Sequence, residues 1–225
     1  MPRYHYDKFP CVPVTGADDA CVSGWEAIGA RLRATVQARG SARTVLTVEC
    51  YPGVLETEAL EQLARELKPQ VVIRAWEALK SEPEINQLCE PYLGGNDPVF
   101  GYLSSLNLPE FFSLDKLTAF YLQLQMATGL VLVVGTGASL IAPGDVLVYA
   151  DLARWEIQQR QRRKVIGNLG VANSHEPAGM KYKRAFFVDW RVADRWKKPL
   201  LGRMDFLLDT NNLREPKLAE GEAIR

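Results

Sequence analysis

The chain has 225 residues, of which 47% are hydrophobic and 24% charged, so it can bury one substantial core and has the composition of a soluble globular protein. Lys and Arg number 27, as do Asp and Glu, and this balance gives no indication of a nucleic-acid or membrane partner. The longest mostly apolar run, residues 129–141, is too short to span a bilayer. The polar, aromatic start is not a signal peptide, so we expect a cytoplasmic protein with reduced thiols.

The elements expected along the chain begin with an irregular arm at 1–22, where proline and glycine interrupt any periodicity. A helix is predicted at 23–39, because apolar residues recur every three or four positions and Ser23 with Glu26 forms a capping box. The later expected elements are a strand at 44–49, a helix at 55–67, a strand at 71–73, a helix from 82, a loop at 93–112, a helix at 114–128, strands at 130–134 and 146–150, a helix at 151–165 capped by Asp151, a polar loop at 167–183, a helix at 187–196 and a strand at 206–208.

Short apolar strands that alternate with amphipathic helices predict an α/β fold. We expect one three-layer domain at 23–210, with a mostly parallel sheet of about five strands and helices on both faces. A polar linker tail is predicted at 211–225. Right-handed crossovers bring the carboxyl ends of parallel strands to one edge of the sheet, and ligands bind there.

The charges are distributed unevenly. Residues 151–203 hold 13 Lys and Arg against 5 Asp and Glu, a net charge of +8, which leaves −8 for the remainder. A basic segment that faces an acidic one predicts an anion site between them, whereas the plainer interpretation is a set of solvated helix faces.

Cysteine and histidine residues do not form a metal motif. No two of the four cysteines have the Cys-x-x-Cys spacing, and the two histidines, His5 and His175, are far apart in the sequence. We therefore expect no metal-binding residues. Nucleophilic catalysis by Cys50 or Cys89 would need a neighbouring histidine base, which this pattern does not favour.

Residues 44–67 have the layout of a phosphate-binding loop without its chemistry. A β-branched strand, a Cys-Tyr-Pro-Gly-Val turn and a helix follow one another, but there is one glycine and no Gly-Lys-Ser/Thr. The backbone amides at Tyr51 and Gly53 are candidate anion ligands at the start of the helix. Since Glu56 and Glu58 already complement the helix dipole, a structural turn is the favoured interpretation.

Two other loops carry candidates. Residues 135–139 contain Gly-x-Gly after a strand, but a third glycine is missing and no helix is expected directly after it, so we interpret the segment as a tight turn rather than a dinucleotide site. Asp97, in a Gly-Gly-Asn-Asp-Pro loop, is a candidate general base for a sugar hydroxyl. Asn-Asp-Pro is also an ordinary turn initiator, and this is the favoured interpretation.

Arg160 and Arg163, in the helix predicted at 151–165, suit bidentate contact with phosphate, and Lys181 opens a second basic group. Together they suggest either a lid that closes over a phosphate or a surface that docks another domain. Cations near a helix carboxyl end also stabilise the helix dipole on a solvated face. No aromatic nucleic-acid motif accompanies them, so nucleic-acid binding is not expected.

In the order of its elements, the chain resembles the uridine kinase and phosphoribulokinase group of P-loop kinases. The segments that carry this resemblance are the strand, loop and helix at 44–67, the Asn-Asp-Pro loop at 96–98, the strand before Gly135 and the strand at 146–151 with the arginines after it. The resemblance implies a P-loop-kinase-like fold with a degenerate phosphate loop.

That resemblance implies roles for three residues. In the kinase group a loop acid contacts the acceptor hydroxyl, which implies that role for Asp97. Arginines of the group form a lid over the nucleotide, which implies that role for Arg160 and Arg163.

A closer similarity in sequence is to the N-terminal region of long bacterial class I mannose-6-phosphate isomerase-like proteins. It spans nearly the whole chain, and the segments that carry it are Tyr6–Pro10, Val48–Val54, Tyr149–Glu156 and Phe187–Arg191. In those proteins a zinc-binding cupin part follows this region. The resemblance implies that zinc and the isomerase chemistry belong to the cupin, and that this chain carries no cofactor and is not catalytic alone.

Three functions stay open at this point. The leading hypothesis is a degenerate kinase-like domain that senses a sugar phosphate or a nucleotide, or acts as a scaffold. An active sugar or nucleoside kinase would use Asp97 as the base and Arg160, Arg163 and Lys181 as the phosphate clamp. An interaction module would use the basic segment to dock an acidic partner, such as a cupin domain.

Overall fold

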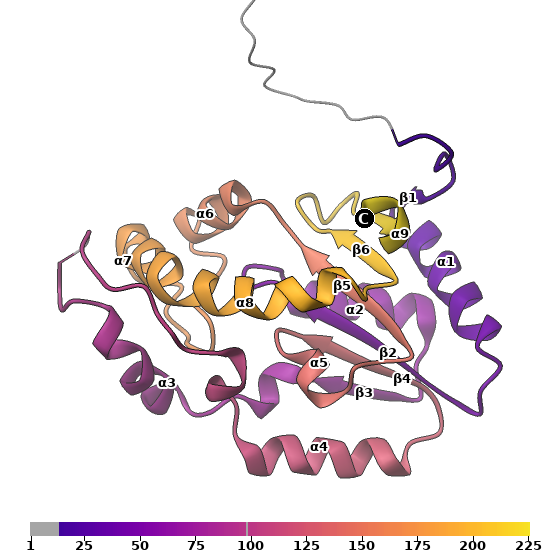
Figure 1. Ribbon diagram of the computed structural model, residues 1–225, viewed down its shortest axis with the longest axis horizontal. Helices are drawn as coiled ribbons and strands as arrows, with labels where there is room; N and C mark the ends of the chain where they lie inside the picture. Colours follow the sequence, from indigo (N-terminus) through magenta and orange to yellow (C-terminus); the bar gives the residue numbers. More distant parts are fainter. Residues whose placement is uncertain (1–13, 98) are drawn as a thin grey trace, which may run out of the picture.

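A computed structural model describes residues 14–97 and 99–225, which form one seven-stranded sheet covered by helices (Figure 1). The predicted α/β class is confirmed, but the sheet is mixed and has seven strands rather than about five. The strands are β1 (Cys21–Ser23), β2 (Arg43–Cys50), β3 (Val71–Arg74), β4 (Gly129–Gly135), β5 (Val146–Asp151), β6 (Phe206–Asp209) and β7 (Lys217–Glu220).

Helices of several kinds connect these strands. The α-helices are α1 (Trp25–Ala38), α2 (Glu56–Leu67), α3 (Glu82–Cys89), α4 (Leu114–Met126), α5 (Ala138–Ile141), α6 (Arg154–Arg162), α7 (Ala178–Arg184), α8 (Trp190–Leu201) and α9 (Gly221–Ile224). Short 3-10 turns are η1 (Ala75–Ala78), η2 (Glu90–Tyr92) and η3 (Leu108–Phe111), and one π-helical turn, η4 (Ala185–Asp189), joins α7 to α8. Within the described ranges, every helix is too short or too polar to cross a bilayer.

The strand order is β1-β7-β6-β5-β2-β4-β3, which places β2 at the centre. β2 pairs in parallel with β4 and β5, and β3 and β6 extend this parallel part on either side. β7 is antiparallel to both β6 and β1. The chain leaves β2 toward β3 on one side and later crosses to β5 on the other, so a crevice is expected outside the carboxyl end of β2.

Alternate residues of the central strands face opposite sides of the sheet. Leu132 and Val134 pack in the cluster formed by α1 and α2, whereas Val131 and Val133 pack in the cluster formed by α3, α4 and α5. α8 contributes side chains to both clusters. Because both faces are buried, the strands are continuous apolar runs, and this pattern made them predictable.

The predicted helix caps differ from the observed ones. Ser23 ends β1, and α1 begins after Gly24 without a side-chain cap, so the expected capping box at Ser23 is wrong. Asp151 ends β5, and Ala153 occupies the N-cap position of α6. Of the predicted arm, residues 1–13 lie outside the described residues, and β1 occupies its last positions.

The segment 211–225 belongs to the sheet, so the predicted linker tail is wrong. β7 pairs with two strands, its Leu218 is buried, and the Trp25 indole donates a hydrogen bond of 2.9 Å to the Leu213 carbonyl. Leu218 is the only buried side chain of the four residues in β7, so hydrophobicity alone gave little sign of a strand.

We predict that Leu218→Ala lowers the free energy of unfolding by about 2–5 kcal/mol, because it removes a buried side chain at the β6–β7 junction. The exposed neighbour Lys217 is the matched control, and Lys217→Ala should change it by less than about 0.5 kcal/mol. Urea denaturation followed by tryptophan fluorescence measures both values. Equally small changes would mean that this segment is a linker after all.

Candidate functional site

A cleft of about 800 Å³ opens at the carboxyl ends of β2, β3 and β4. Its walls are the turn and helix start at 52–58, the loop at 165–172 after α6, and the residues Trp76, Glu77, Leu79, Lys80, Glu82, Lys116 and Thr136. This is the edge at which open α/β sheets bind ligands, so the cleft is the candidate functional site.

Glu49, near the end of β2, is 1% exposed and reaches across to the turn after β4. Its carboxylate accepts hydrogen bonds from the backbone N–H groups of Gly137 and Ser139, both at 2.7 Å, and from the Ser139 hydroxyl at 2.6 Å. The Trp196 indole donates to the same hydroxyl at 3.0 Å. Burial raises the pKa of Glu49 to about 7, although these hydrogen bonds act to lower it.

Glu56, the first residue of α2, binds the same turn at Thr136, the residue before Gly137. Its carboxylate accepts from the backbone N–H and the hydroxyl of Thr136, both at 2.7 Å, and burial raises its pKa. Gly137 has a φ of 85°, and a Cβ there would lie 2.3 Å from the Phe112 ring. The predicted tight turn is present at 136–137, but the short helix α5 follows it directly, which the sequence analysis did not expect.

The turn after β2, which carries the predicted anion ligands, packs against β5 and α6. The Tyr51 backbone N–H donates to the Ala150 carbonyl at 2.9 Å, and its phenol donates to Asp194 at 2.8 Å. Gly53 has a φ of 115°, and a Cβ there would lie 2.9 Å from the Ile157 side chain of α6. Helix α6 therefore packs directly on the turn where a phosphate loop would stand.

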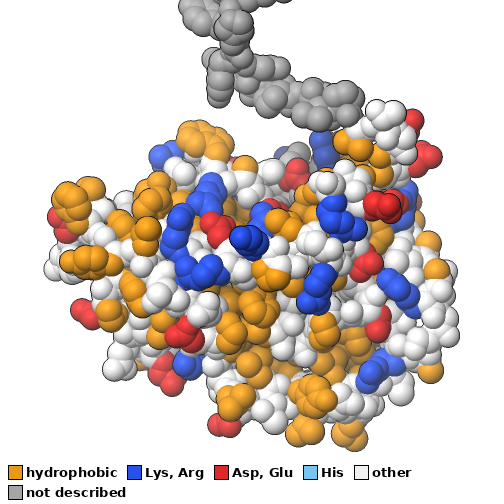
Figure 2. All heavy atoms as spheres, viewed as in Figure 1, with side chains coloured by type: hydrophobic (Ala, Val, Ile, Leu, Met, Phe, Trp, Pro, Cys, Tyr) orange, Lys and Arg blue, Asp and Glu red, His pale blue; other side chains and the backbone are white. Residues whose placement is uncertain are grey.

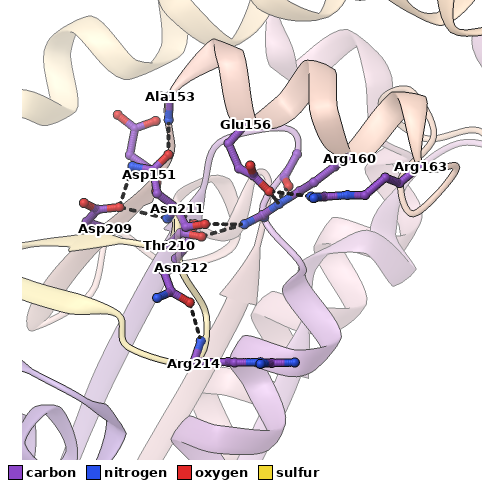
Figure 3. Close-up of polar contacts among 11 residues, drawn as sticks. Asp151, Ala153, Glu156, Arg160, Arg163, Asp209, Thr210, Asn211, Asn212 and Arg214 are labelled. Atoms are coloured by element: carbon purple, nitrogen blue, oxygen red, sulfur yellow. Dashed lines mark hydrogen bonds and ion pairs between the residues drawn. The ribbon is translucent and has the colours of Figure 1, made fainter. Parts of the chain in front are cut away.

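The Arg160 side chain is buried, and its hydrogen bonds connect different segments of the chain (Figure 3). It donates to the Gly53 carbonyl at 2.9 Å and to the Thr210 carbonyl at 2.6 Å, and its Nε–H pairs with Glu156 at 3.0 Å. Figure 3 shows its guanidinium directed from α6 toward the backbone after β6. These contacts join the turn after β2, helix α6 and the end of β6.

Lys181 is completely buried and also donates to backbone carbonyls. Its ammonium group lies 2.7 Å from the carbonyls of Gln161 and Ser174 and 3.4 Å from that of Ile166. Burial lowers the pKa of Lys181. Its three donors therefore hold the loop between α6 and α7, and none is directed to solvent.

The other two predicted residues are exposed. Arg163 pairs with Glu156 at 2.8 Å, and Asp97 accepts the backbone N–H groups of Val99 at 2.7 Å and Phe100 at 2.9 Å. These two bonds hold the pKa of Asp97 below its usual value. Asp97 thus makes the turn that its motif predicts, and its loop is tied to α7 by Lys183, which donates to the Asp97 carbonyl.

The structure brings Gly53 and Arg160 into contact but does not gather the predicted residues into the cleft. Asp97, Arg160, Arg163 and Lys181 are absent from the cleft walls. Within residues 14–97 and 99–225, no three His, Cys, Asp or Glu side chains come together as metal ligands.

Glu49 and Glu56 are the site residues that the sequence analysis did not select. One signal was available for Glu49: it is the only charged residue between Thr44 and Cys50. A carboxylate on a strand that is buried on both faces needs hydrogen-bond donors from a neighbouring element. The sequence gives no indication of which turn supplies them.

Comparison with protein families gives one match. The model of a family described as "Domain of unknown function (DUF8485)" matches residues 24–225, and so covers all elements from α1 to α9. The chain belongs to this family. No curated protein matches the sequence.

We predict that Arg160→Met lowers the free energy of unfolding by about 3 kcal/mol, because it leaves buried carbonyls without a donor and breaks a buried ion pair. Arg163 pairs with the same carboxylate but its side chain is 59% exposed, so Arg163→Met should cost less than about 1 kcal/mol. Urea denaturation of both variants gives the comparison. Equal losses of unfolding free energy in the two variants would contradict the structural role of Arg160.

The raised pKa of Glu49 predicts a stability that depends on pH. Folded Glu49 keeps its proton up to about pH 7, whereas an unperturbed glutamate loses it near 4.5, so between these values the folded state binds more protons. The free energy of unfolding should therefore fall as pH rises from about 4.5 to about 7.

Glu49→Gln removes this titration and should make the fall shallower, since Glu56 still contributes, while Glu58→Gln, at an exposed position of α2, should leave the fall unchanged. Denaturation of the three proteins at a series of pH values makes the measurement. A Glu49→Gln curve parallel to that of the wild-type protein would contradict the assignment.

Proposed function

We propose that this chain is a non-catalytic domain with a P-loop-kinase-like arrangement, which serves as a scaffold in proteins of the mannose-6-phosphate isomerase-like group. The sequence similarity described above motivates the group. Two features support the kinase-like arrangement. β2, the first of the parallel strands along the chain, lies between β4 and β5, and a turn joins it to α2. The sheet order also differs from the Rossmann and flavodoxin orders, which argues against those two nucleotide-binding folds.

The observation that carries the proposal is that the turn and the cations assigned to phosphate are engaged within the protein. The Tyr51 backbone N–H donates to the Ala150 carbonyl, α6 packs against Gly53, and Arg160 and Lys181 donate to backbone carbonyls. A triphosphate needs free amides and free cations at these positions. Their engagement favours a scaffold over an active kinase.

Charges in the cleft favour scaffolding over the sensing of a sugar phosphate or a nucleotide. Glu58, Glu77 and Glu82 line it, against Lys80 and Lys116. The Lys116 ammonium already donates to the Leu79 carbonyl at 2.8 Å. Excess negative charge raises the free energy of an anion bound there.

The basic segment supports an acidic protein partner, of which a cupin-type domain is the one that the resemblance suggests. Figure 2 shows Lys and Arg side chains over the face formed by α6 and α8. Lys164, after α6, and Lys198, in α8, are exposed and free for such a contact in the described part of the chain. Paired surfaces of opposite charge favour association at low salt.

Titration calorimetry with ATP·Mg and with mannose 6-phosphate tests the non-catalytic part of the proposal. We expect no heat from either and no ATP hydrolysis. Heat of binding from mannose 6-phosphate would contradict a purely scaffolding role and support the sensing of a sugar phosphate. ATP hydrolysis that is lost in both Asp97→Asn and Arg163→Ala would replace it by the kinase function.

Docking is tested by capture of a purified cupin domain from a mannose-6-phosphate isomerase-like protein. We predict capture at low salt that is lost near 1 M salt, where the Debye length is about 3 Å. The double variant Lys164→Glu/Lys198→Glu should abolish capture. Arg65→Glu/Lys68→Glu, at two exposed positions at the end of α2, reverses the same number of charges and should leave capture unchanged. Capture that ignores both salt and charge reversal would contradict docking through this face.

A further inference from the structure

Helix α4 exposes large apolar side chains that the described part of the chain leaves uncovered. Leu114 is 77% exposed, Leu122 59% and Met126 86%, and Tyr121 beside them is 56% exposed. Other apolar residues of the helix pack on the core. Figure 2 shows hydrophobic side chains along the edge of the molecule where Figure 1 draws α4. A helix that is apolar on every side is normally buried, so this face calls for a partner.

The exposed face of α4 is large enough for a specific interface. At about 150–200 Å² for each fully exposed side chain, its four apolar residues present about 400–550 Å². The exposed Thr118, Ala119, Gln123 and Gln125 lie among them and bring the face close to the roughly 800 Å² per subunit of a standard interface. An apolar patch of this size is at the upper end of what a monomer exposes and is typical of an interaction site.

The spacing of residues on this face fits a second copy of the same helix. Leu114, Thr118, Leu122 and Met126 follow one another at intervals of four, so they form one ridge along α4. When two such ridges run antiparallel about a twofold axis, Leu114 lies toward Met126 of the second copy, and the smaller Thr118 toward Leu122. Residues 117–126 include no charged residue, so the centre of this contact brings no like charges together.

Charges at the two ends of α4 favour the antiparallel arrangement. Asp115, in the first turn, is exposed. Arg43 is also exposed and lies at the last turn, where it donates to the Leu124 carbonyl at 3.0 Å. An antiparallel pair brings Asp115 of each copy toward Arg43 of the other, so the same ion pair forms twice. A parallel pair would bring Asp115 toward Asp115 and Arg43 toward Arg43.

We infer that this protein forms a twofold symmetric dimer through antiparallel α4 helices. The apolar ridge forms the centre of the interface, and an ion pair between Asp115 and Arg43 lies on its rim at each end. Figure 1 shows α4 apart from α6 and α8, so the basic face of each subunit stays free. The inference is independent of the scaffold proposal, because no residue of that basic face takes part.

Sedimentation velocity on the full chain tests the dimer. At roughly 100 μM, well above the micromolar limit for interfaces of standard size, we expect twice the 25.2 kDa mass of one chain. Leu122→Glu and Met126→Glu should each give the mass of one chain, because they place carboxylates of both copies in an apolar contact. Leu103→Glu is the matched control, since Leu103 is 60% exposed and lies in a loop outside α4, and this variant should stay dimeric. A wild-type protein that sediments as a monomer, or dimers that persist in Leu122→Glu and Met126→Glu, would overturn the inference.

An exchange of charges tests the antiparallel arrangement. Asp115→Arg and Arg43→Glu should each weaken dimerisation about tenfold, since each replaces two ion pairs by two repulsive contacts. An equal mixture of the two variants should dimerise as the wild-type protein does, because the mixed dimer has one Asp–Arg and one Arg–Glu pair.

Circular dichroism melting curves check that the charge variants fold. Arg43→Gln keeps a donor for the Leu124 carbonyl and is the milder replacement, and its mixture with Asp115→Arg should recover part of the dimerisation. A mixture that dimerises no better than its separate components would overturn the antiparallel pairing of the α4 helices.

Discussion

Two carboxylates, those of the buried Glu49 and the partly buried Glu56, organise the carboxyl edge of the sheet. Each accepts two or more hydrogen bonds from the turn after β4, and all of these donors are neutral backbone or hydroxyl groups. A carboxylate without a cation beside it is expensive to bury, which is why the pKa values of both residues are raised. The turn is thereby fixed to β2 and α2, and an incoming anion would meet occupied donors and negative charge.

The basic segment after β5 first serves the fold. Arg160 joins the turn after β2 to the end of β6, and Lys181 donates to one carbonyl of α6 and to two carbonyls of the loop before α7. Buried cations that satisfy several carbonyls remove the cost of leaving those carbonyls unpaired. Some basic residues of this segment therefore hold the fold together from inside. Only the exposed basic residues are available to a partner.

Sequence reasoning located the parallel core and the edge that carries the site, because β2, β4 and β5 are apolar on both faces and so stand out as continuous runs. It did not find β1 and β7, which are three and four residues long and bury few side chains. It also predicted a polar loop at 167–183, which is wrong for the last six residues because α7 begins at Ala178. The roles of Arg160 and Lys181 depend on carbonyls that tertiary packing brings to them, and the spacing of basic residues does not encode this.

The pairing of β1 with β7 has a mechanical consequence. Cys21 pairs with Ala219 and Ser23 with Lys217, so the chain enters β1 and leaves β7 at the same end of this short antiparallel ladder. Tension applied between the two ends peels the rungs apart one at a time instead of shearing them together. We therefore expect this corner of the molecule to yield under load before the parallel strands that carry the cleft.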